Sequence, residues 1–92
     1  MIKPTHYSID LDDEKHLITI TPVTQILPGS KVSVTGVFKL SEGATDMGEI
    51  VFDDNMNQWE YTGLGHITHV EAAQIAEFIR GFKDTNDEEG FI

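Results

Sequence analysis

Residues 67–83 constrain the fold more than any other stretch, because they have the full pattern of an amphipathic helix. Thr68 and Glu71 form a Thr-x-x-Glu capping box, in which each side chain satisfies a backbone amide at the helix start. Gly81 either ends the helix or weakens its last turn. Such a helix needs an apolar surface to cover, which the rest of the chain must provide. Its own apolar residues recur at spacings of three and four and share one face: Ala72, Ile75, Ala76, Ile79 and Phe82.

The chain before this helix has the alternating pattern of half-buried strands. We expect the first two runs to form a hairpin. Pro22 is expected to end the second strand or to mark an edge, since proline cannot donate a ladder hydrogen bond. Residues 23–30 are predicted as a connector and residues 41–46 as a flexible loop. The predicted strands are residues 6–12, 16–21, 31–40, 48–53 and 58–62.

These elements predict an α+β fold, in which an antiparallel meander of about five strands carries one C-terminal helix packed on one face. Gly36 interrupts the apolar face of the third strand, which indicates a bulge, a bend or the close approach of another element. A chain of 92 residues can bury one core but not two, so residues 1–83 are predicted to form a single globular domain. Residues 84–92 are acidic without apolar periodicity, and we predict a flexible C-terminal tail.

Charge is the strongest global feature of the chain. Sixteen Asp and Glu residues against six Lys and Arg residues give a formal net charge of −10 at pH 7. This charge repels phosphates and anionic membranes, so we expect neither direct nucleic-acid binding nor membrane binding. The sequence shows no secretory signal, no apolar run long enough to span a membrane, and no cysteine. We therefore expect a cytoplasmic protein.

The candidate binding surface consists of Trp59, Tyr61, Asp53 and Asp54. The two aromatic residues share one face of the last predicted strand, and the two acids lie in the turn before it. If the aromatic rings face away from the helix, they form an exposed patch, which is rare without a binding purpose. The alternative is that they are ordinary core residues.

His66 and His69 lie three residues apart at the entry to the helix, with Glu71 nearby. Imidazole is a common metal ligand, so these residues are the one metal candidate in the chain. However, His66 precedes the helix cap, so the two rings need not point together. No His-Glu-x-x-His pattern or cysteine completes a site. No residue pattern indicates catalysis, and we expect no cofactor.

The leading hypothesis is a small acidic, non-enzymatic protein-binding or adaptor module. Its charge favours a basic protein partner, and it can form a homodimer through a sheet edge or an exposed face. The first alternative is an acidic mimic of nucleic acid that inhibits a basic protein. The second alternative is a small metal-dependent enzyme that uses His66, His69 and Glu71. The positions of the aromatic residues and of the carboxylates relative to the helix distinguish these hypotheses.

Overall fold

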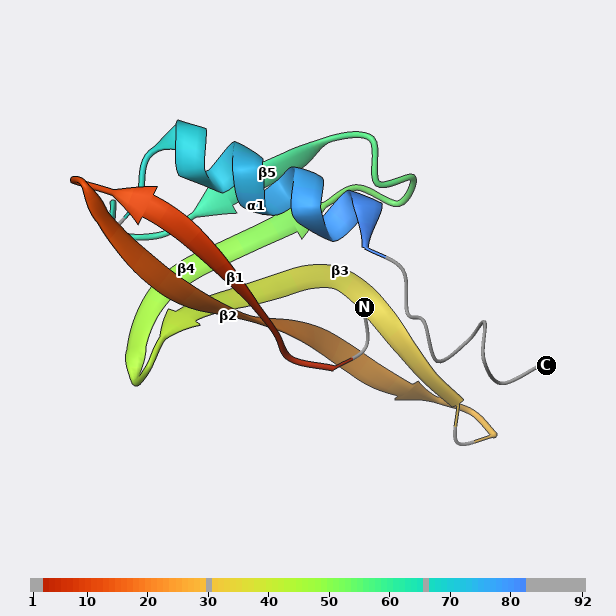
Figure 1. Cartoon of the computed structure of the whole chain (residues 1–92). Coiled ribbons are helices and arrows are strands. Elements are labelled where there is room, and N and C mark those ends of the chain that lie inside the picture. The colour runs from red at the N-terminus through yellow and green to blue at the C-terminus, as the bar shows by residue number, and fades with distance from the viewer. Residues whose placement is uncertain (1–2, 30, 66, 83–92) are drawn as a thin grey trace, which may run out of the picture.

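The computed structural model describes residues 3–29, 31–65 and 67–82. One antiparallel sheet with the strand order β1-β2-β3-β4-β5 carries a single helix (Figure 1). The predicted α+β meander with a C-terminal helix is confirmed. No helix within the described residues is long and apolar enough to cross a membrane. The elements are β1 (Thr5–Leu11), β2 (Glu14–Leu27), β3 (Lys31–Glu42), β4 (Thr45–Phe52), β5 (Trp59–Thr62) and α1 (His69–Gly81).

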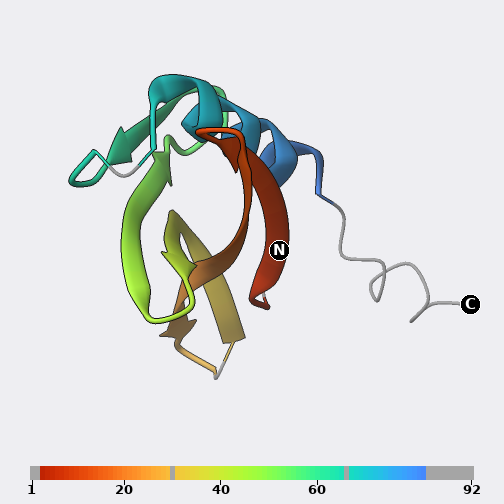
Figure 2. The same ribbon diagram turned by 60° about the vertical axis from the view of Figure 1, so that its left-hand side comes forward.

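The sheet is strongly curved, and α1 lies across its open side (Figure 2). The helix contacts β1 and β5, which are the first and last strands of the sheet. The core therefore lies between the concave face of the sheet and the helix. Each large side chain buried there contributes roughly 1.5–3 kcal/mol before entropy is counted. The core residues are Ile9, Ile18, Ile20, Phe38, Leu40, Met47, Ile50, Phe52, Ile67, Ala72, Ile75, Ala76 and Ile79.

The capping box at the start of α1 is confirmed. The backbone amide of Thr68 donates to Glu71 Oε1 at 2.8 Å, and the Val70 amide donates to Thr68 Oγ1 at 3.2 Å. The helix ends at Gly81, where the amide of the next residue, Phe82, donates to the carbonyl of Ile79 at 3.2 Å. The sequence therefore predicted both ends to within two residues.

The predicted connector over residues 23–30 is wrong, because β2 continues through Pro22 to Leu27. Beyond Ile20 no residue of β2 pairs with β1, so Pro22 lies at an edge, where a missing N–H is tolerated. The register with β3 shifts between Pro22 and Thr24, opposite Gly36, whose φ of +88° confirms the predicted irregularity. A side chain at Gly36 would lie 3.2 Å from the carbonyl oxygen of Phe52 in β4.

The predicted flexible loop over residues 41–46 is also wrong. β3 runs to Glu42 and β4 starts at Thr45, with Gly43 in a left-handed conformation (φ +59°) in the short turn between them. The register then shifts between Leu40 and Ser41, because β4 has one extra residue before Gly48. The turn at Gly43 and the bulge before Gly48 together bend the β3–β4 hairpin, and this bend contributes to the curvature of the sheet.

Candidate protein-binding surface

Trp59 and Tyr61 lie on the helix-bearing face of the sheet. They pair with Phe52 and Ile50, which are buried in the core, and paired residues of antiparallel strands point to the same face. Both aromatic side chains are half-buried against the core cluster. The indole ring of Trp59 stacks on the ring of His69, with 5.2 Å between centroids. Neither ring forms a patch on the opposite face of the sheet.

The Tyr61 side chain connects two neighbouring strands through a hydrogen bond. Its hydroxyl donates to the carbonyl oxygen of Met47 at 2.6 Å, which joins β5 to the irregular start of β4. Burial raises the pKa of the Tyr61 phenol, and the negative charge of Asp46 raises it further, while a hydrogen bond from the Ile67 amide lowers it. The phenol is therefore neutral at physiological pH and acts as a hydrogen-bond donor.

Asp53 and Asp54 are exposed in the turn between β4 and β5. Asp53 Oδ1 accepts hydrogen bonds from the amides of Asn57 at 2.8 Å and Gln58 at 3.3 Å, so this carboxylate holds the turn together. Asp53 and Trp59 line one shallow hollow, and Asp53 and Asp54 line a second, larger groove. Tyr61 lines neither. The structure thus brings three of the four predicted residues around this turn and separates Tyr61 from them.

Of the three predicted metal ligands, His69 and Glu71 lie within the described residues. His66 lies outside the described residues, while His69 is exposed at the start of α1 with its ring on Trp59. The Glu71 carboxylate is engaged with Thr68 in the capping box, and these hydrogen bonds lower the pKa of Glu71. Among the described residues, no group of three or more His, Asp or Glu side chains is placed to hold a metal ion.

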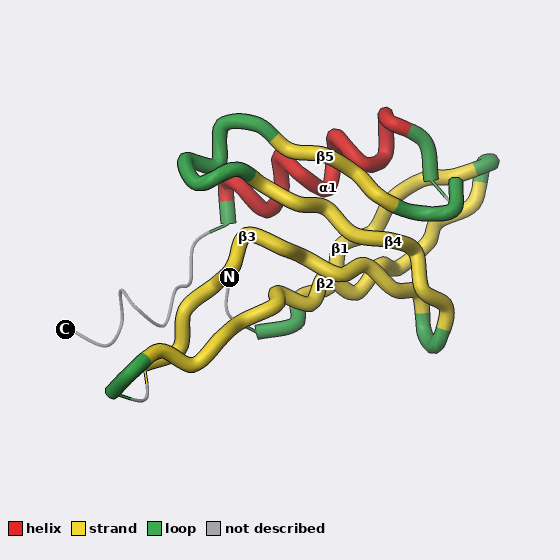
Figure 3. Tube along the Cα trace, turned by 180° about the vertical axis from the view of Figure 1, so that it is seen from behind, coloured by secondary structure: helices red, strands yellow, loops and turns green. Residues whose placement is uncertain are grey.

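A long hairpin projects from the body of the protein, and the sequence did not predict it. This arm consists of residues 23–29 and 31–36, and Figure 3 shows it extending away from the helix. β1 pairs with β2 only as far as Ile20, and β4 pairs with β3 only as far as Val37, so the arm is a two-stranded ribbon. None of its residues with a described exposure is buried. Ile26 is 78% exposed and Val34 is 46% exposed.

A groove of about 360 Å³ lies where the arm joins the body, between β3, the β4–β5 turn and the end of α1. Its lining is nearly equally polar and apolar, and its charged residues are Asp53, Asp54 and Arg80. Arg80 is paired with Glu77 at 2.8 Å. Apolar side chains from three separate elements meet here because the helix ends before it reaches the arm. The groove is lined by Val34, Gly36, Asp54, Met56, Arg80 and Phe82, among others.

Charge separates the arm from the rest of the molecule. Residues 15–41, which include the whole arm, contain three lysines and no Asp or Glu, although the full chain has sixteen acids. The described carboxylates lie instead at the β1–β2 turn, along β3 to β5 and on α1. The acid-free run was visible in the sequence and was the one signal for this element.

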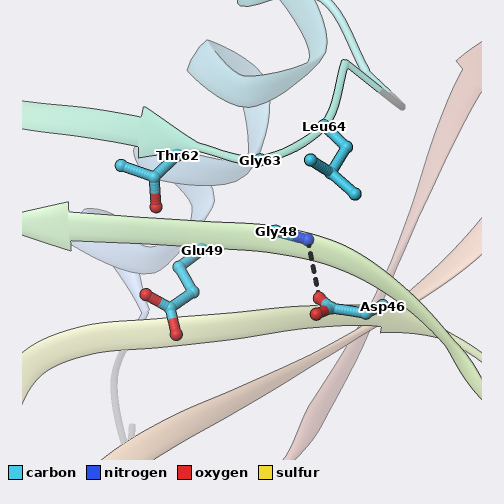
Figure 4. Close-up of a pocket in the computed structure, with 6 residues that line it drawn as sticks. All are labelled: Asp46, Gly48, Glu49, Thr62, Gly63 and Leu64. Atoms are coloured by element: carbon cyan, nitrogen blue, oxygen red, sulfur yellow. Dashed lines mark hydrogen bonds between the residues drawn. The ribbon is translucent and has the colours of Figure 1, made fainter.

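A separate hollow of about 310 Å³, distinct from the two beside the β4–β5 turn, lies beside the end of β5 (Figure 4). Asp46 turns back onto the chain, where its Oδ1 accepts from the amide of Gly48 at 2.9 Å. Glu49 and Thr62 lie beside it, and Leu64 at the rim is 92% exposed. Among the described residues, no third carboxylate or imidazole joins these two to make a group that could hold a metal ion.

Comparisons with known protein families, curated proteins and solved structures found no match for this chain.

Proposed function

We propose that this chain is a non-enzymatic protein-binding module and that the arm is its contact element. The observation that carries the proposal is the exposure of Ile26 and Val34 on a ribbon that covers no core. A two-stranded hairpin is at best marginally stable alone in water and becomes stable when an apolar face is covered. Burying each of these two side chains against a partner would contribute roughly 1.5–3 kcal/mol.

The two alternatives lack such an observation. A nucleic-acid mimic rests only on the net charge of −10, since the described carboxylates are spread over several elements of the chain. A metal-dependent enzyme requires a third ligand beside the two histidines, and the Glu71 carboxylate is engaged in the helix cap. The acidic surface outside the arm is also compatible with the proposal. A partner that extends beyond the arm onto this surface would need basic residues there, because opposite charges favour the contact.

Site-specific photo-crosslinking in cells that produce the protein tests the proposal. A benzophenone side chain at position 26 should give a discrete adduct with a protein. The matched control is position 64, since Leu64 is also an exposed apolar residue but belongs to the segment after β5 and not to the arm. The end of β5 points away from the arm (Figure 1). The proposal fails if position 26 gives no adduct, or if position 64 gives the same adducts in equal yield.

A further inference from the structure

We infer that the arm binds a second copy of this chain, so that two arms pack face to face and antiparallel, each tip in the groove of the other copy. This inference rests on the proposed function, because it names the partner of the same element. The resulting dimer is two-fold symmetric, and every tip-to-groove contact occurs twice.

Charge favours the arm as the place where two copies meet. Each chain has a formal net charge of −10, so two copies repel each other wherever carboxylates approach within a Debye length of about 8 Å. The arm is free of acids, and Lys31 is its one charged residue. Two arms therefore bring together the parts of the molecule that repel each other least.

The arm and the groove lie on the same side of the sheet. Val34 lines the groove and pairs with Thr24, and Ile26 lies two residues further along β2, so it shares the face of Thr24. The arm spans five residues of β2, or roughly 17 Å at about 3.3 Å per residue. When two such arms pack antiparallel on this face, the tip of one reaches the base of the other, where the groove lies.

The groove is complementary to the tip. Its apolar residues, which include Met56 and Phe82, offer Ile26 a surface that the other described residues leave open. At its rim, Asp54 is exposed and takes part in no hydrogen bond between described residues. Residues 26–31 at the tip contain no Asp or Glu, so the tip can approach Asp54 without repulsion between carboxylates.

Sedimentation equilibrium of the full chain over a range of concentrations tests the inference. We expect a monomer–dimer equilibrium that Ile26→Ser weakens by about a hundredfold or more, because the contact is lost twice per dimer. Leu64→Ser is the control and should leave the equilibrium unchanged, since Leu64 is 92% exposed outside the arm. Circular dichroism of each variant establishes that the fold is retained.

A charge placed on one face of the arm tests the geometry separately. Thr24 shares the face of Ile26, whereas Gln25 is on the opposite face, and both residues are exposed. Thr24→Glu should weaken the dimer by at least about tenfold, because it brings a carboxylate against a second acidic copy, and Gln25→Glu should leave the equilibrium unchanged. A dimer that is indifferent to Thr24→Glu, or one that Gln25→Glu weakens equally, overturns the face-to-face arrangement.

The remaining outcomes separate this inference from the proposed function. A chain that stays monomeric while position 26 crosslinks to a different protein overturns the second copy as partner and leaves the binding function intact. A monomer that crosslinks position 26 only to its own residues 83–92 assigns the apolar face of the arm to that segment and overturns the inference. Absence of any adduct, with a strictly monomeric chain, overturns both.

Discussion

Replacing Gly48 by alanine should destabilise the protein far more than an ordinary surface substitution. Gly48 has a φ of +101°, which side chains rarely adopt. A Cβ at this position would lie 2.6 Å from the carbonyl oxygen of Thr62 and 2.8 Å from Tyr61 Cε1. The carbonyl belongs to the backbone of β5 and cannot rotate away. The substitution must therefore displace β5 or β4.

The expected magnitude combines two costs. An L-residue with positive φ costs about 1–2 kcal/mol. Forcing a methyl group into occupied space costs about 1–3 kcal/mol more. The sum is roughly 2–5 kcal/mol, a large part of the roughly 5–15 kcal/mol that stabilises a domain. The midpoint of thermal unfolding should fall by at least about 8 °C, given about 4–8 °C per kcal/mol in a domain of this size.

Urea unfolding, followed by circular dichroism and by the fluorescence of Trp59, measures the loss. The matched control is Gly43→Ala, because Gly43 also has a positive φ of +59° but has no heavy atom within 4 Å of the added Cβ. The control variant should lose about 1–2 kcal/mol. If the two variants lose the same free energy of unfolding, the close packing of Gly48 under β5 is refuted.

Three further predictions concern the arm, the helix cap and Tyr61. Replacing residues 24–34 by Asn-Gly should not lower the free energy of unfolding of the monomer, because no core residue is lost and the arm no longer has to be ordered; a loss above about 1 kcal/mol in urea unfolding would assign the arm to the folding core. Thr68→Ala should cost about 0.5–2 kcal/mol in the same assay. Because the cap lowers the pKa of Glu71 below its usual 4.5, this contribution is present above that pH and is lost as the pH falls through the lowered value. A Thr68→Ala loss that is the same at all pH values would contradict the coupling. Conversely, burial raises the pKa of Tyr61 above 10.0, so stability is full below that pH and declines as the pH rises through the raised value. Tyr61→Phe should remove that alkaline decline in thermal melts, and an unchanged decline would assign it to other groups.

The helix and the antiparallel meander could be predicted because each depends on local patterns. The capping box and the apolar spacing of α1 involve residues at most four positions apart, and the structure places them as expected. The alternation within β1 likewise predicts which of its side chains face the core. Where a segment is half-buried and short-range contacts dominate, the sequence alone contains enough information.

The candidate site could not be predicted in the same way. Trp59 and Tyr61 face the helix because of the register between β4 and β5, which alternation alone does not determine. Pro22 indicated either the end of a strand or an edge, and the pattern alone did not show that the strand continues beyond an unpaired edge. The acid-free composition of residues 15–41 was informative, but its meaning depends on knowing that part of this run leaves the body as an arm.

The arm is difficult to explain by folding alone. Thr35 Oγ1 donates to the carbonyl of Val23 at 2.9 Å, so a short turn placed just beyond this contact would already complete the sheet. Ordering the arm residues beyond this contact costs about 1–2 kcal/mol of backbone entropy per residue. Ile26 and Val34 offset little of this cost in the single chain, because their side chains are exposed. An element that costs free energy in the single chain recovers it when its apolar face is covered. The arm is therefore expected to be stabilised by a partner that covers its apolar face. The absence of acids from the arm favours a second, equally acidic copy of the chain as that partner.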